Sequence, residues 1–147
     1  MVCRLPMNAA KLLPLLVLVS LARGADWPSY RGSEASGIAT ESPGPTSWDL
    51  AAGTNVQWAT PIPGLGLSSP VVWGDRVFLT TAVAEEGKAE LKVGLYGDIE
   101  SADDNGPQSW QVICLARETG KILWSKELHK GAPKSKRHTK SSHANCT

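Results

Sequence analysis

The sequence has little of what marks several large classes of protein. It lacks an excess of charge of one sign, because 15 Lys and Arg stand against 14 Asp and Glu and give a formal net charge of +1. That balance gives no reason to expect a nucleic-acid partner. With 41% hydrophobic and 20% charged residues, the composition excludes a disordered polyelectrolyte and a polytopic membrane protein. Six Trp stand against one Phe, and with 14 Gly and 10 Pro this composition favours short strands joined by turns.

Residues 1–24 have the pattern of a secretory signal peptide. Arg4 and Lys11 precede a mainly apolar run at residues 12–21, which is too short to span a bilayer because spanning takes about 20 residues. Ala22 and Gly24 place small residues at the cleavage positions before Ala25. The sequence therefore predicts a periplasmic or extracellular protein with no transmembrane segment after cleavage.

Few cysteines are present, and no two are adjacent. Removal of the leader leaves Cys114 and Cys146. An oxidising compartment permits a disulfide between them, but the sequence does not say whether they lie close enough, so a disulfide and two free thiols both stay open.

The rest of the chain divides by composition. Residues 25–54 hold dense Pro and Gly and predict an extended N-terminal arm. Residues 55–128 hold apolar runs that predict short strands at 55–62, 71–73, 76–81, 110–115 and 121–128, with hairpin turns at 74–75 and 117–120. Within them, residues 84–109 are acidic and predict a solvated insertion with one short strand near 91–95. Residues 129–147 are basic and polar and predict a solvated linker into a further blade.

Two parts of the sequence repeat. Residues 56–62 and 122–128 both read apolar-x-Trp-x-x-x-apolar, with Trp58 and Trp124 at the shared position, and each is followed by a Ser-Ser pair. Without the acidic insertion the two tryptophans lie about 40 residues apart, a spacing that suits one four-stranded blade of a β-propeller.

Residues 114–124 resemble the repeat of pyrroloquinoline-quinone-type (PQQ-like) β-propellers, which reads roughly Ala-x-Asp-x-x-Thr-Gly-x-x-x-Trp. Thr119, Gly120 and Trp124 match this pattern, whereas Cys114 and Ala116 replace its Ala and Asp. The arm at residues 26–32 is similar to the N-termini of exported, BamB-like members. The resemblance implies an all-β propeller of four-stranded blades, of which this chain supplies the arm and about one blade as an N-terminal fragment.

Two functions follow from the resemblance. The leading one is a non-catalytic scaffold that binds a protein or a small ligand through the propeller surface, with no cofactor, catalytic residue or metal ligand assigned in this chain. The alternative is the N-terminal part of a PQQ-dependent quinoprotein dehydrogenase. A small self-contained β domain is a third possibility.

Two groups of residues could be read as metal sites or as solvated loops. Calcium at the acidic residues of the insertion is disfavoured because their spacing does not fit an EF-hand. Zinc at the histidines of the tail is disfavoured because four basic side chains lie among them. The first set is Asp98, Glu100, Asp103 and Asp104, and the second is His129, His138, His143 and Cys146.

Overall fold

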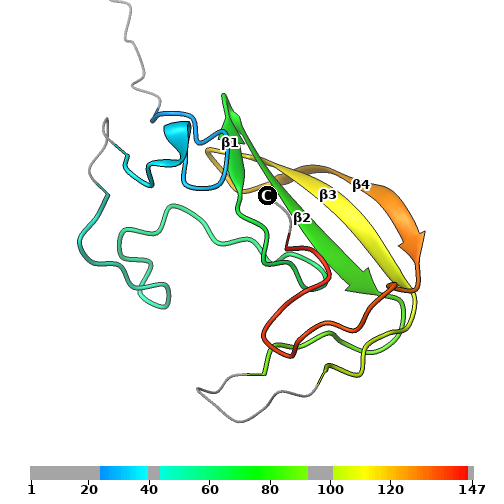
Figure 1. Ribbon diagram of the computed structural model, residues 1–147. Helices are drawn as coiled ribbons and strands as arrows, with labels where there is room; N and C mark the ends of the chain where they lie inside the picture. The colour runs from blue at the N-terminus through cyan, green and yellow to red at the C-terminus, as the bar shows by residue number, and fades with distance from the viewer. Residues whose placement is uncertain (1–23, 40–43, 93–100, 146–147) are drawn as a thin grey trace, which may run out of the picture.

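The protein is an all-β chain built on one antiparallel sheet. The structure is a computed structural model that describes residues 24–39, 44–92 and 101–145. Four strands, β1 (Val71–Trp73), β2 (Arg76–Ala84), β3 (Gln108–Ala116) and β4 (Ile122–Gly131), lie in the order β1-β2-β3-β4 (Figure 1). The prediction of an all-β fold is confirmed. The predicted leader at residues 1–24 falls almost wholly outside the described residues, and Asp98, Glu100 and Cys146 also lie outside them.

The hairpin of β1 and β2 forms as its sequence predicts. Gly74 and Asp75 make the two-residue turn, since Trp73 pairs with Arg76 across it. Along β2 the side chains alternate, so that Val77 packs with Ile113 and Leu115 of β3 in the small apolar core. Phe78 points to the opposite face, where its ring lies 6.1 Å from that of Trp124. Alternation therefore assigns the two faces of β2.

The hairpin of β3 and β4 turns at Gly120. Its φ of +67° is in the left-handed region that favours glycine. The Gly120 N–H donates to the Ala116 carbonyl at 2.8 Å, and the Thr119 hydroxyl accepts from the Lys121 N–H at 3.3 Å. Both residues therefore stabilise the hairpin turn that the sequence predicts at residues 117–120. Beyond the turn, β4 continues to Gly131, three residues past its predicted end.

The strand predicted at residues 55–62 is absent, and that prediction is wrong. Val56, Trp58 and Thr60 do alternate toward the protein, but their backbone forms no ladder. Instead, the Trp58 indole N–H donates to the Arg117 carbonyl at 2.8 Å, and the Thr60 hydroxyl donates to the Gly120 carbonyl at 2.7 Å. This segment thus docks on the β3–β4 turn through side chains, and Pro61 within it has no N–H to contribute to a ladder.

The two edges of the sheet differ. Trp27 of the arm exchanges two backbone hydrogen bonds of 2.9 Å with Val72, so the arm covers part of the β1 edge. Arg117 holds the start of the arm by donating to the Gly24 carbonyl at 2.7 Å. On the far side of the sheet, no strand pairs with the outer edge of β4 in the part of the chain that the structure describes. No helix of the described residues has the length and apolar composition to cross a bilayer.

Candidate functional site

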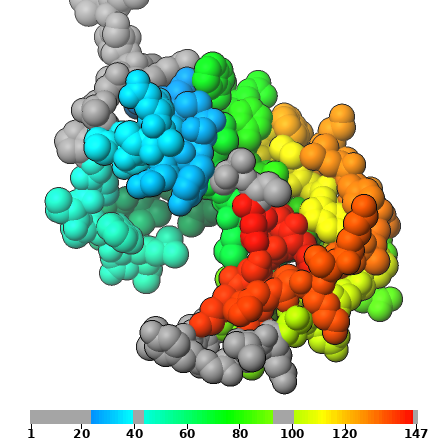
Figure 2. Space-filling model, in the orientation of Figure 1, coloured from blue at the N-terminus to red at the C-terminus, as the bar shows by residue number. Residues whose placement is uncertain are grey.

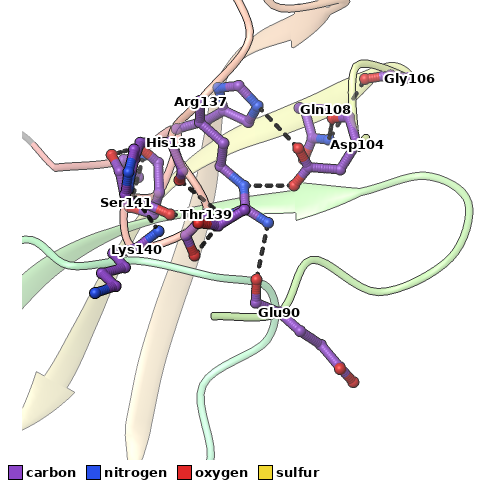
Figure 3. A network of polar contacts seen from close by, with 12 residues as sticks. Glu90, Asp104, Gly106, Gln108, Arg137, His138, Thr139, Lys140 and Ser141 are labelled. Atoms are coloured by element: carbon purple, nitrogen blue, oxygen red, sulfur yellow. Dashed lines mark hydrogen bonds and ion pairs between the residues drawn. The ribbon is translucent and has the colours of Figure 1, made fainter. Parts of the chain in front are cut away.

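The most buried charged side chain in the described segments is Arg137, which lies after β4. Its guanidinium Nε lies 2.5 Å from a carboxylate oxygen of Asp104, and the two side chains are only 4% and 13% exposed. Nη1 donates to the Ser141 carbonyl at 2.8 Å and Nη2 donates to the Glu90 carbonyl at 3.0 Å (Figure 3). A planar guanidinium can donate several hydrogen bonds in different directions at once. The Arg137 side chain thereby connects Asp104, Ser141 and Glu90. We call Glu90, Asp104, Arg137, Ser141 and His143 the Arg137 cluster.

Backbone contacts reinforce the Arg137 cluster. The Ala102 N–H donates to the Arg137 carbonyl at 2.9 Å, and the Lys92 N–H donates to the Thr139 carbonyl at 3.1 Å. A β-bridge joins Ser101 to His138 between these contacts. The loop between β2 and β3 therefore lies against the segment after β4, and the two run side by side below the sheet in Figure 1.

This packing limits two predictions of solvated structure. In the described parts of the acidic insertion, residues 84–92 and 101–109, Glu85, Glu86, Glu90 and Asp103 are exposed, but Asp104 is committed to Arg137. The described part of the basic linker, residues 129–145, is not wholly solvated, since Arg137, Ser142 and Ala144 are buried and its first residues belong to β4. The expected strand near residues 91–95 is not present at residues 91–92, and the rest of it lies outside the described residues. Of the opposite charges on the two segments, Asp104 and Arg137 meet as a buried pair.

His143 completes the Arg137 cluster beside the sheet. Its Nε2 atom lies 3.7 Å from the second Asp104 oxygen, and its ring meets the Trp110 ring edge-on at 6.4 Å. The Trp110 indole N–H donates to the His143 carbonyl at 2.9 Å. The segment after β4 is thereby anchored to β3, so the Arg137 cluster positions this segment over one end of the sheet.

Of the candidate metal ligands, the structure describes Asp103, Asp104, His129, His138 and His143, and these do not form a metal site. No group of three or more His, Cys, Asp or Glu suited to a metal occurs within residues 24–39, 44–92 and 101–145. The Trp110 ring lies 5.2 Å from the His129 ring at a tilt of 37°, and the edge-on contact of Trp110 also engages His143. The His138 Nδ1 atom accepts from the Lys140 N–H at 3.1 Å. Asp104 faces a guanidinium, which would repel a cation. We therefore read the Arg137 cluster as a clamp that fixes structure.

The second candidate is the outer strand. Residues 122–130 of β4 are all exposed. Three of their side chains are charged, namely Lys126, Glu127 and Lys130, and four are apolar, namely Ile122, Leu123, Trp124 and Leu128. Trp124 is 40% exposed and Leu128 is 64% exposed, although both belong to β4. Figure 2 shows β4 in orange along the rim of the molecule. A strand that pairs on one side only and carries exposed apolar and charged side chains offers an edge to which other chains can add.

An ion pair links the end of β4 to the loop after β2. The Lys130 ammonium contacts the Glu85 carboxylate, and the hydrogen bond and charge of that carboxylate raise the pKa of Lys130 above the usual lysine value. Because the pKa is raised on folding, the pair stabilises the fold below the pKa of an unfolded lysine. This contribution is lost as the pH rises through the folded pKa.

We expect an NMR titration of the Lys130 side chain to give a midpoint above the usual lysine value. Glu85→Gln should return the Lys130 midpoint to the ordinary range, because it removes the carboxylate. An unchanged midpoint in that variant would show that Glu85 is not the cause.

The structure describes one of the two cysteines that follow the predicted leader. Cys114 is fully buried in β3. Cys146 lies outside the described residues, so the two alternatives, a disulfide and two free thiols, both stay open.

Sequence reasoning missed the Arg137 cluster. Asp104 and Arg137 are separated by 33 positions, and neither stands in a motif. The only signal in the sequence was the opposite charge of the two segments. Comparisons of the chain with protein-family models, with curated proteins and with solved structures gave no match.

Proposed function

We propose that the chain is part of an exported PQQ-like β-propeller protein and serves as a non-catalytic scaffold for protein or ligand contact. The observation that carries this proposal is the sheet itself, a four-stranded antiparallel meander whose β3–β4 turn receives Trp58 from the preceding segment. A propeller blade is such a meander. The repeat pattern at Thr119, Gly120 and Trp124 supports the same reading, because its Gly makes the turn and its Trp stands on the outer strand.

Further support comes from what this sheet leaves uncovered. Trp124 and Phe78 form an aromatic pair on one face, and Trp124 keeps 40% of its surface exposed. A blade uses such a face to pack against a neighbouring blade, since each repeat cannot bury its apolar surface alone. Export is supported by the leader pattern of residues 1–24, which places the scaffold in the periplasm or outside the cell.

The scaffold and the quinoprotein dehydrogenase are separated by one assay on the complete gene product. We expect no alcohol-dependent dye reduction after incubation with PQQ and calcium, and no quenching of tryptophan fluorescence on addition of PQQ alone. N-terminal sequencing of the secreted product should begin at Ala25. Dye reduction that requires PQQ would overturn the scaffold proposal in favour of the dehydrogenase.

A further inference from the structure

The outer edge of β4 offers the backbone of the sheet to another chain in the part of the protein that the structure describes. β4 pairs with β3 on its inner side, whereas the opposite edge of the sheet is bonded to Trp27. Within the described ranges no segment bonds to the outer side of β4. Figures 1 and 2 place this strand on the rim, where nothing described covers it. Its outward N–H and C=O groups can therefore bond to an added strand.

The side chains of the β4 edge give it a charge. Lys121, Lys126 and Lys130 stand along or beside the strand, and Glu127 is its one acidic side chain. Glu127 accepts a hydrogen bond of 2.6 Å from the Ser109 hydroxyl, so its carboxylate is partly compensated by a donor within the sheet. The Lys130 ammonium is likewise engaged by the Glu85 carboxylate, so the basic character of the edge comes from Lys121 and Lys126. The edge therefore favours a partner that carries carboxylates.

Apolar side chains add a second feature to the β4 edge. Two register shifts occur in the pairing of β3 with β4, and they leave Leu123 and Leu128 without a partner on β3. Both are bulge residues, and they are 45% and 64% exposed. Bulges commonly re-aim side chains at sheet edges. They also confine the regular stretch to residues 124–127, so an added strand would make a short contact and bind reversibly.

We propose that the β4 edge binds an extended acidic peptide segment of another protein, which adds to the sheet as a further strand. The backbone of β4 supplies the hydrogen bonds, the lysines attract the carboxylates, and Leu123 and Leu128 meet apolar side chains of the peptide. A second copy of this chain is the poorer occupant, because pairing β4 with itself brings two lysine-rich strands together. The proposal deepens the scaffold role, on which it rests, by naming the chemistry of the partner.

The test is a binding titration of the whole chain with a labelled peptide of about ten residues in which glutamate and valine alternate. Fluorescence anisotropy should show binding of this peptide and no comparable binding of its lysine–valine counterpart. Affinity should fall about tenfold when NaCl is raised from about 0.05 M to about 0.5 M. N-methylation of alternate peptide amides should abolish binding, because it removes the donors that strand addition requires.

Variants locate the contact on β4. Lys126→Glu should lower the affinity for the glutamate–valine peptide about tenfold. Lys88→Glu makes the same charge change in the loop after β2 and should leave the affinity unchanged. Both residues are exposed, so neither variant is expected to unfold the protein.

Three results would overturn this inference. Equal binding of the N-methylated peptide would show attraction by charge alone, and equal effects of the two lysine variants would place the contact elsewhere. A concentration-dependent dimer that Lys126→Glu disrupts would make a second copy the occupant. These failures are distinct from failure of the scaffold role, since PQQ-dependent dye reduction would remove that role whether or not the peptide binds.

Discussion

Replacing Arg137 with methionine is expected to destabilise the protein by about 3–5 kcal/mol, the usual effect of removing one partner of a buried ion pair. The Asp104 carboxylate, 13% exposed, would lose the guanidinium that now lies 2.5 Å away. The Glu90 and Ser141 carbonyls would lose their donors as well. Hydrogen exchange should reveal the loss at the amides of Lys92 and Ala102, which bond to the segment that carries Arg137.

Two further variants test whether burial of the Arg137–Asp104 pair causes the expected loss of stability. Arg76→Met removes the guanidinium of an exposed pair, in which Arg76 lies 3.5 Å from Asp75 with side chains 46% and 73% exposed. It should change stability by less than about 1 kcal/mol. Adding Asp104→Leu to Arg137→Met should restore much of the stability, because no unpaired carboxylate then remains buried. Equal effects of Arg137→Met and Arg76→Met would contradict the structural role of the Arg137 cluster.

Replacing Gly120 with alanine is expected to destabilise the protein by about 2–5 kcal/mol, because two penalties add. A side chain at a φ of +67° is strained by about 1–2 kcal/mol. The new Cβ would also lie 2.7 Å from the Thr60 hydroxyl oxygen and closer still to the Trp58 ring, and overpacking of this kind costs about 1–3 kcal/mol more. The indole N–H signal of Trp58 should shift as its hydrogen bond to the Arg117 carbonyl is displaced.

Gly74→Ala is the matched control for this second prediction. Gly74 makes the other hairpin turn, with a φ of +58°, but an added Cβ there meets no atom within 4 Å. The control should therefore show the backbone penalty alone and leave the Trp58 signal in place. If both glycine variants destabilised the protein equally, the packing of Trp58 on the β3–β4 turn would not contribute to stability.

These two sites differ in how far they could be foreseen. Thr119 and Gly120 were identified from neighbouring residues, because a turn between two apolar runs depends on local backbone conformation. The partners of Gly120, Trp58 and Thr60, were assigned to a strand instead. Their alternation was correctly recognised, but alternation only states which side chains share a face. It does not state whether the backbone finds a partner strand.

The sequence by itself determined the all-β class and the positions of the two hairpins. Each of these depends on residues within a few positions of one another. Only the tertiary structure decided that the acidic and basic segments close on the Arg137 cluster, that Trp27 covers the β1 edge, and that β4 stays open. These contacts join residues far apart in the chain, and their selection depends on which pairs can leave water together with their hydrogen bonds satisfied.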